Sequence, residues 1–391
     1  FLAAAGLAVS TLETVLTLLF RRRGHFFRPG LRRQASTISF PPAASRRPFV
    51  SIVKPVCGLE DELRENLLSF IDLHGIEYEV ILSVAETSDP AIAVIEEVMQ
   101  ANPAAPFRLI VGGDPLFERL NRKVARLIEA YKFARGEILF ISDANVRVDA
   151  DTIAGTVDAF RGRVGCVSNL FTGSGAATFG ATIESLHLLS FVVTGSVLAA
   201  AANIPCVVGK SMAISRRALE AIGGFVAFAD VLAEDQAIGL AVREARYSVE
   251  LSPLVVRNTV IRRTLKRALG RQIRWNKIRY AFSKPEYTAE FLANPLPFAI
   301  AAATAACLTT SSFAPALLIP AVVAVRILQL ALLAVATNAP VTFVQLLATP
   351  VLDLCQFAAQ FVPYFSDRVT WRGYTARLGP RTSLVSIERA A

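Results

Sequence analysis

The sequence has few charged side chains for its length of 391 residues. Only 19% of the residues are Asp, Glu, Lys or Arg, whereas 53% are hydrophobic and the mean hydropathy is +0.46. This composition excludes a disordered chain and a coiled coil, both of which are much richer in charge. We therefore expect a protein that is partly embedded in a membrane and partly folded in water.

Cysteine and histidine are scarce and scattered. The five cysteines include no CxxC pair, and His25, His74 and His187 lack the spacing of metal ligands. These absences exclude a disulfide scaffold and a zinc site, and they indicate reduced thiols in a reducing compartment. The sequence also lacks GxGxxG, GxxxxGK[ST] and any recognisable Ser or Cys nucleophile motif, so it supports neither a dinucleotide fold nor a P-loop nor covalent catalysis.

The apolar residues that are present gather at both ends. Residues 1–20 contain one acid, Glu13, and would form a helix of about 30 Å, enough to cross a bilayer. Residues 21–47 then hold eight arginines and no acid, namely Arg21, Arg22, Arg23, Arg28, Arg32, Arg33, Arg46 and Arg47. Positive charge after the apolar run indicates a signal anchor with its arginine side in the cytoplasm. We expect Glu13 to face another helix or the interface. Because the first residue is Phe1 and not Met, we also expect that further residues precede it.

A second apolar block spans residues 291–365, where Arg326 and Asp353 are the only charges. Breaks near Pro315 and Pro340 divide it into segments 291–311, 316–337 and 341–364, the last of which is more polar and is expected to be re-entrant or interfacial. Two full spans would return the tail, with Arg368, Arg372, Arg377 and Arg381, to the cytoplasm, as the positive-inside rule favours. The predicted organisation is an anchor (1–20), a basic juxtamembrane linker (21–47), a cytoplasmic domain (48–285), two or three membrane segments (286–365) and a basic tail (366–391).

The middle domain alternates strand and helix patterns. Strands are predicted at 49–53, 78–84, 107–111 and 137–141, and helices at 60–73, 90–101, 119–133 and 150–162. Strands separated by helices of this length predict a mainly parallel α/β sheet, whose ligands bind beyond the carboxyl ends of the strands. The net charge of +9 arises largely from residues beside the membrane segments. This distribution favours anionic lipid over nucleic acid as the partner.

Two acids follow strands of this predicted sheet, Asp89 after the second and Asp143 after the fourth. Asp143, in Ser142-Asp143-Ala144-Asn145, would suit a divalent cation that bridges a diphosphate, or it would simply cap the next helix.

Glu234-Asp235 stands at a probable helix start. One interpretation is again capping or compensation of the helix dipole, and the other is a general base for an acceptor hydroxyl.

Arg271, Arg274 and Trp275 lie in a basic helical pattern over 264–282. An interfacial amphipathic helix with Trp as an aromatic anchor explains these residues without catalysis. The alternative is a functional role for the arginines.

The order of these features resembles the D, D, D, (Q/R)xxRW pattern of membrane-bound inverting glycosyltransferases with a GT-A fold, and most closely the ceramide glucosyltransferase family. The resemblance covers residues 50–282 and extends to the terminal membrane segments. It is carried by the segments Val50–Gly58, Asp89–Ile92, Asn121–Lys123, Ser142–Val148, Phe225–Ala229, Ala233–Asp235 and Arg271–Arg279.

The resemblance implies a nucleotide-sugar donor, most closely UDP-glucose, and a membrane-lipid acceptor, most closely ceramide. It implies Asp235 as the base, and donor contacts from Asp89, Lys123, Asp143 and Glu234. It also places Mg²⁺ or Mn²⁺ at Asp143, and the diphosphate and acceptor near Arg271, Arg274 and Trp275.

Two departures from the family pattern stand out. The usual DxD is Asp143-Ala144-Asn145, and Phe191-Val192-Val193-Thr194 replaces the histidine and proline of the animal acceptor region. The alternatives to ceramide glucosylation are transfer of N-acetylglucosamine to a hopanoid or another lipid, a processive polysaccharide synthase and a non-enzymatic membrane scaffold.

Overall fold

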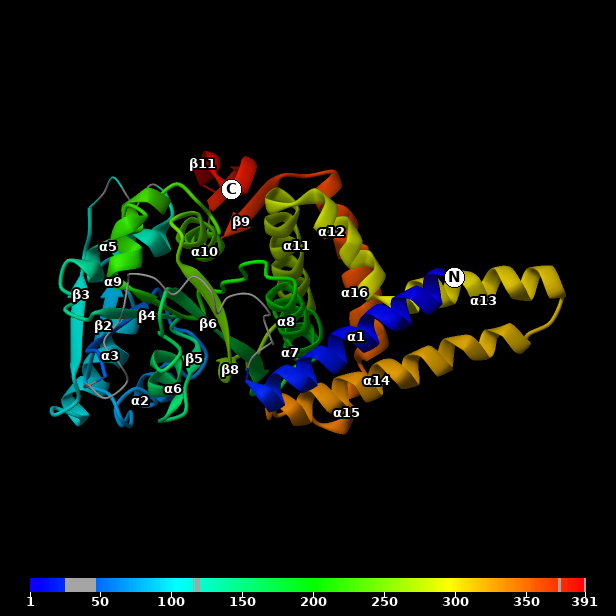
Figure 1. The fold of residues 1–391 in the computed structure, drawn as a ribbon, viewed down its shortest axis with the longest axis horizontal. Helices are drawn as coiled ribbons and strands as arrows, with labels where there is room; N and C mark the ends of the chain where they lie inside the picture. Colours follow the sequence, from blue (N-terminus) through cyan, green and yellow to red (C-terminus); the bar gives the residue numbers. More distant parts are fainter. Residues whose placement is uncertain (25–46, 115, 117–119, 372–373, 390–391) are drawn as a thin grey trace. The chain divides into compact units, whose positions relative to one another are not determined.

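The computed structural model describes residues 1–24, 47–114, 116, 120–371 and 374–389 (Figure 1). Within it the chain forms two compact units. The first comprises Phe1–Arg22, Thr172–Leu198 and Val260–Ala391, and the second comprises Arg23–Phe171 and Ala199–Thr259. Arg28, Arg32, Arg33, Arg46 and Arg372 of the predicted basic segments, together with His25, lie outside the described residues.

The second unit is built on an eight-stranded sheet with the order β3-β2-β1-β4-β7-β6-β8-β5. Its first half is parallel, as predicted, because β1 pairs in parallel with β2 and β4, and β2 with β3. These strands are β1 (Val50–Pro55), β2 (Tyr78–Val84), β3 (Phe107–Val111) and β4 (Ile138–Ser142). The helices that follow them are α2 (Leu63–Leu68), α3 (Ala91–Ala101), α5 (Arg122–Tyr131) and α6 (Thr152–Val157). Strands and helices alternate as expected, although α2, α5 and α6 are shorter than their predicted ranges.

The second half of the sheet is antiparallel. Strand β7 pairs antiparallel with both β4 and β6, and β5 with β8. The strands are β5 (Val146–Arg147), β6 (Val164–Ser174), β7 (Ser211–Ser215) and β8 (Ser248–Thr259). Because β7 runs opposite to β4, with Ser211 beside Ser142, the residues just before β7 reach the same edge as the residues just after β4.

A continuous apolar core covers one face of this sheet. Alternate residues of the strands, such as Val53, Ile81 and Leu139, pack there against Leu127 of α5 and Ile238 of α10. The period of two in β-strands places every second side chain on this face. The covering helices are α5, α9 (Arg216–Ala221), the short η3 (Phe225–Phe228) and α10 (Glu234–Glu244).

The first unit consists mainly of helices. It contains α1 (Leu2–Arg23), α7 (Phe179–His187), η2 (Leu188–Val193), α8 (Thr194–Ala201), α11 (Leu265–Phe282), α12 (Lys284–Ala289), η4 (Glu290–Ala293), α13 (Pro295–Thr310), η5 (Ala314–Leu317), α14 (Leu318–Thr337), α15 (Phe343–Leu346), α16 (Thr349–Phe361) and η6 (Val362–Tyr364). Helix α11 confirms the predicted helix over 264–282. The tail folds into a three-stranded sheet, which its basic composition did not reveal. Its strands are β9 (Arg368–Trp371), β10 (Tyr374–Leu378) and β11 (Leu384–Arg389), and the short helix η7 (Pro380–Thr382) joins the last two.

Among the described residues, three helices are long and apolar enough to cross a membrane: Leu2–Arg23, Phe179–Ala201 and Ala314–Thr337. A bent pair, Lys284–Ala293 with Pro295–Thr310, makes a fourth candidate, with 61° between its halves. The predicted third segment, 341–364, is broken into α15 and the 13-residue α16. At about 1.5 Å per residue, a helix of that length is too short to span a bilayer.

Candidate active site

Asp143 follows β4 directly, at the edge where the parallel strands end. Its side chain is 29% exposed, although the strand that leads to it is fully buried. The next helix begins only at Thr152, with Asp151 at its N-cap. The interpretation of Asp143 as a helix cap is therefore wrong, and its carboxylate is available for other contacts.

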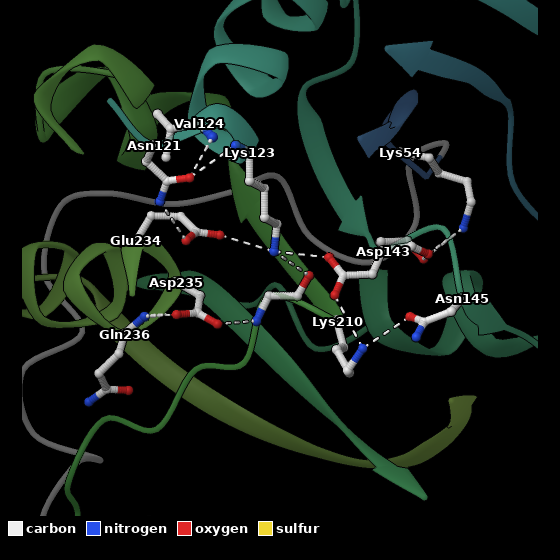
Figure 2. Close-up of polar contacts among 12 residues, drawn as sticks. Lys54, Asn121, Lys123, Val124, Asp143, Asn145, Lys210, Glu234, Asp235 and Gln236 are labelled. Carbon is white, nitrogen blue, oxygen red and sulfur yellow. Dashed lines mark hydrogen bonds and ion pairs between the residues drawn. The ribbon is translucent and has the colours of Figure 1, made fainter. Parts of the chain in front are cut away.

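Lys123 is placed beside Asp143 by the start of α5. The Asn121 side chain accepts hydrogen bonds from the backbone N–H groups of Lys123 and Val124, which fixes the first turn of the helix. The Lys123 ammonium then lies 3.0 Å from Asp143 Oδ1 and 3.0 Å from Glu234 Oε1 (Figure 2). One lysine thus joins two acids that are far apart in the sequence.

Glu234 and Asp235 occupy the first turn of α10, where acids also compensate the helix dipole. Ala233 holds the N-cap position, so neither acid is the capping residue. Asp235 Oδ2 accepts a 2.6 Å hydrogen bond from the backbone N–H of Gly209, and Oδ1 accepts one of 2.8 Å from Gln236 (Figure 2). The carboxylate is therefore held in one orientation while lone pairs remain for a substrate proton.

Gly209 connects Asp235 to Lys123. Its N–H donates to Asp235, and its carbonyl accepts a 3.3 Å hydrogen bond from the Lys123 ammonium. A Cβ at this position would stand 2.6 Å from Lys123 Nζ and 3.2 Å from Asp235 Cβ. Only glycine lets the backbone approach both side chains this closely.

Lys210 completes the cluster and was not predicted from the sequence. Its ammonium lies 3.2 Å from Asp143 Oδ2 and donates a 3.0 Å hydrogen bond to Asn145 Oδ1 (Figure 2). The only feature of the sequence that could have pointed to Lys210 is its position directly before the apolar strand β7. This position places Lys210 beside Asp143 only because β7 pairs antiparallel with β4, which the sequence does not show.

Lys54 lies fully buried at the end of β1. Its ammonium donates to Ser142 Oγ at 3.1 Å and to the Asp143 carbonyl at 3.0 Å, and it sits 3.9 Å from the centre of the Phe70 ring. The pKa of Lys54 is lowered to about 7, mainly by burial; the charge of Asp143 opposes this shift, and the charge of Lys210 adds to it. Lys54 lies in the segment Val50–Gly58, which resembles the family pattern but did not predict a role for this lysine.

Charge pairing sets the protonation of the other groups. Burial alone would raise the pKa of Asp143, but Lys123 and Lys210 outweigh it and hold that pKa well below the ordinary value. Burial would lower the pKa of Lys123, but Asp143, Glu234 and Asp235 raise it above the ordinary value. The pKa of Glu234 is raised, because burial exceeds the opposing effect of Lys123. Asp143 is therefore ionised and Lys123 charged across the physiological range.

The residues around Asp143 do not fit a resident divalent cation. In the described part of the chain, no three His, Cys, Asp or Glu side chains are grouped as metal ligands. Both Asp143 oxygens already face ammonium groups, and the second oxygen donor of the motif is the neutral Asn145 amide. A divalent cation bound by Asp143 would lie beside two ammonium groups, which repel it.

Asp89 follows β2 at the same edge but takes no part in the lysine cluster. Its carboxylate accepts hydrogen bonds from Gly58 N–H at 2.9 and 3.0 Å and from Ala91 N–H at 2.9 Å. It thereby fixes the loop after β1 to the start of α3. These contacts are those of a loop-positioning residue.

Arg271, Arg274 and Trp275 belong to the other unit, on α11. Arg271 forms an ion pair with the buried Glu184 of α7, and its guanidinium lies 4.7 Å from the centre of the Trp275 ring. Trp275 is also 6.0 Å from the His187 ring. Arg274 is partly buried on the same helix. These contacts anchor α11 against α7.

The chain is similar to several known glycosyltransferases. Ceramide glucosyltransferase 3 of Caenorhabditis elegans is 26% identical over 244 residues, which is 61% of this chain and 52% of that protein. Ceramide glucosyltransferase of Komagataella phaffii is 28% identical over 153 residues, covering 39% of this chain and 30% of that protein. The chain thus spans about half the length of the C. elegans relative, and less of the yeast one.

A solved structure confirms the fold. The mannosyltransferase PcManGT from Pyrobaculum calidifontis, in complex with GDP-Man and Mn²⁺, superimposes with a TM-score of 0.50 at 19% identity. The match covers 93% of this chain and 99% of that one. The predicted GT-A architecture with terminal apolar helices is therefore confirmed. The model of one family matches residues 3–384, nearly the whole chain, and the chain belongs to glycosyl transferase family 21.

Proposed function

We propose that this chain transfers a sugar, with inversion, from UDP-glucose to the hydroxyl group of ceramide, giving glucosylceramide. Family membership and the names of the relatives support a glycosyltransferase that acts on a ceramide-like lipid. The observation that carries the proposal is the convergence of Asp143, Glu234 and Asp235 on Lys123. This cluster lies at the edge of the sheet where α/β folds bind their ligands.

In the proposed reaction, the lipid hydroxyl oxygen attacks the anomeric carbon of glucose from the face opposite the diphosphate. The carboxylate of Asp235 takes the hydroxyl proton. The bond from the anomeric carbon to the diphosphate oxygen breaks, and its electron pair leaves with UDP. Asp235 suits the role of base because two backbone N–H groups orient it and it is not fully enclosed.

We give the other residues the roles that the family pattern implies, modified where their contacts in the structure differ. Lys123 and Asp143 bind at the diphosphate end of the donor, and Glu234 holds the Lys123 ammonium beside Asp143. Asp89 acts on the nucleotide through the loop that it fixes. Arg271, Arg274 and Trp275 keep their expected role toward the diphosphate and acceptor. We place the domain that carries Asp235 on the cytoplasmic side of the membrane.

The test is transfer of labelled glucose from UDP-glucose to ceramide by the protein purified in detergent. Asp235→Asn should lower kcat by about 10²–10⁴-fold, the usual contribution of a general base. The matched control is Asp230→Asn, the same change at an exposed acid five positions earlier. It should leave kcat unchanged. Undiminished transfer by Asp235→Asn would remove Asp235 from the mechanism.

A panel of donors and acceptors tests the substrates. UDP-glucose, UDP-N-acetylglucosamine and GDP-mannose would each be paired with ceramide and with a hopanoid, in Mg²⁺, Mn²⁺ or EDTA. We expect the UDP-glucose and ceramide pair to be fastest. Faster transfer of N-acetylglucosamine to the hopanoid would replace the proposed substrates but keep the enzyme class. No product from any pair would contradict the proposed function.

A further inference from the structure

The lysine cluster around Asp143 occupies the place where a metal-dependent enzyme would hold its cation. Lys123 faces one oxygen of Asp143, Lys210 faces the other, and the Lys54 ammonium contacts the carbonyl of the same residue. These three lysines come from α5, from the residue before β7 and from β1. The fold therefore brings three ammonium groups to one residue, and two of them, those of Lys123 and Lys210, face its carboxylate.

The second residue of the DxD motif is Asn145 in this chain, and its side chain accepts a hydrogen bond from a lysine. Where the family pattern has an aspartate, this chain has Asn145, whose side-chain oxygen accepts a hydrogen bond from Lys210. An amide oxygen carries no formal charge, so it ligates a divalent cation more weakly than a carboxylate does. It remains a good acceptor for an ammonium group. The presence of Asn145 in place of an aspartate therefore suits a lysine at position 210 better than it suits a divalent cation.

The two lysines beside the carboxylate are fixed in place. The Lys210 side chain is 6% exposed and is held by Asp143 and Asn145 together. The Lys123 side chain is 17% exposed and is held by Asp143, Glu234 and the Gly209 carbonyl. Neither ammonium can turn into solvent to admit a cation without leaving buried acceptors unpaired.

We infer that Lys210, with Lys123, takes the place of the divalent cation, so that the chain binds the diphosphate of its nucleotide donor without a metal. The inference rests on the proposed function, since it concerns the donor of that reaction. Asp143 then positions the two ammonium groups and does not ligate a metal. An ammonium group is a recognised partner of phosphate oxygens, which its positive charge attracts.

The experiment measures binding of UDP to the full chain in detergent by calorimetry, in EDTA and in millimolar Mg²⁺ or Mn²⁺. The Kd in EDTA should lie within about threefold of the Kd with either metal. Lys210→Ala should raise the Kd at least tenfold in EDTA, and Lys210→Arg should recover part of the loss because it keeps the charge. Lys132→Ala, which alters a half-exposed lysine next to the end of α5, is the matched control and should bind UDP as the wild type does.

A designed variant makes the reverse prediction. Asn145→Asp combined with Lys210→Ala restores the second carboxylate and removes the ammonium. UDP binding by this double variant should improve at least tenfold when Mn²⁺ is added. A melting curve for each variant identifies any that does not fold. If the double variant does not fold, Lys210→Arg and the single substitution Asn145→Asp replace it. Asn145→Asp alone should make UDP binding more sensitive to Mn²⁺.

The possible results separate the two proposals. Binding of UDP by the wild type only in the presence of metal would overturn the role of the lysines but leave glycosyl transfer intact. Unchanged binding by Lys210→Ala in EDTA would also overturn it. Absence of nucleotide binding under every condition, with no transfer in the substrate panel, would contradict the proposed function and the inference with it.

Discussion

Lys54 shows how one buried residue can make stability depend on pH. Burial lowers its pKa from the model-peptide value of 10.5 to about 7. Between pH 7 and 10.5 the unfolded chain therefore holds a proton that the folded chain has largely lost. Stability rises with pH wherever the unfolded state binds more protons. Lys54 should thus destabilise the fold most below pH 7 and progressively less up to pH 10.5.

The substitution Lys54→Met isolates this effect. Methionine keeps the length and apolar contacts of the stem, so the variant should melt at a higher temperature than the wild type at pH 7, by an amount equivalent to a few kcal/mol. The advantage should shrink steadily as the pH is raised toward 10. Melting curves in detergent across this range provide the measurement. Lys132→Met controls for the loss of one positive charge, and a wild-type-to-variant difference that does not change with pH would contradict the prediction.

The site residues that the sequence did not predict are those whose position depends on strand pairing. The structure brings together Asp143, Glu234, Asp235 and Lys123, which the sequence proposed as site residues because they lie in segments that resemble a known pattern. Lys210 has no such segment, and it reaches Asp143 only because β7 pairs antiparallel with β4. Antiparallel pairing between segments about 70 residues apart leaves no local trace in the sequence, since period-two patterning does not specify the partner strand.

At the scale of elements, the start of α5 serves both stability and the site. Asn121 caps the helix through its side-chain oxygen, and its side-chain amide donates a 2.7 Å hydrogen bond to the Val231 carbonyl. The same residue thus begins the helix that bears Lys123 and ties it to the segment that leads into α10. Loss of the side chain should affect both.

Substitutions at Asn121 can separate the two roles. Asn121→Ala removes the cap and the Val231 contact, and it should lower the free energy of unfolding by about 2 kcal/mol or more. Asn121→Ser retains a capping oxygen and should recover about 1 kcal/mol of that loss. Denaturation in detergent measures both variants. Equal stability of the Ala and Ser variants would show that the cap contributes nothing.

The parallel half of the sheet could be predicted from sequence, whereas the antiparallel half and the tail could not. Strands 78–84 and 107–111 agree with β2 and β3 at both ends, because short, mainly apolar runs that contain Val and Ile end there. The tail is rich in arginine, and from the sequence these residues predict only its side of the membrane. It forms strands because its residues pair with one another, as Thr375 does with Thr370 and Glu388.

The apolar helices of the first unit are joined by a buried ion pair. Arg326 of α14 donates to both oxygens of Asp353 of α16, at 3.0 and 3.1 Å, and also to Gln329. The two side chains are 5% and 0% exposed. These were the only charges in the predicted apolar block, and each satisfies the other.

Breaking this pair should be costly, whereas replacing it should not. Arg326→Met leaves Asp353 buried without its partner and should lower stability by about 3–5 kcal/mol. The double substitution Arg326→Met with Asp353→Leu removes both charges and should be close to the wild type or above it. Thermal denaturation in detergent gives the comparison. A double variant as unstable as Arg326→Met would mean that the lost packing matters more than the unpaired charge.

At the scale of the whole molecule, chain connectivity limits how many helices can cross a bilayer. The helix Phe179–Ala201 is long and apolar enough to do so, but β6 precedes it and β7 follows it, and these two strands are hydrogen-bonded neighbours. A single crossing would place the two strands on opposite sides of the membrane. This segment is therefore not a complete span. The protein itself buries 72% of its most apolar 18-residue stretch, which agrees with this conclusion.

The same reasoning predicts that the tail lies on the same side of the membrane as the sheet. Only residues 260–264 separate β8 from α11, so no span lies between the sheet and that helix. Lys277 of α11 donates a 3.0 Å hydrogen bond to Ser366 and another to the Arg368 carbonyl at the start of β9. The number of crossings between α11 and the tail must therefore be even. The bent pair Lys284–Thr310 and the helix Ala314–Thr337 supply two.

This topology predicts which cysteines a membrane-impermeant maleimide can reach in sealed vesicles of known orientation. Each probe is a single cysteine in a background without the others: native Cys57, which is exposed, Ser312→Cys between α13 and α14, and Val385→Cys in β11, where the native side chain is 65% exposed. We expect Cys57 and Val385→Cys to react from the cytoplasmic side and Ser312→Cys from the other. Detergent should then make all three reactive, which controls for burial. Labelling of Val385→Cys from the side of Ser312→Cys would mean an odd number of crossings, and the contacts between Lys277 and the tail could not then exist in the membrane.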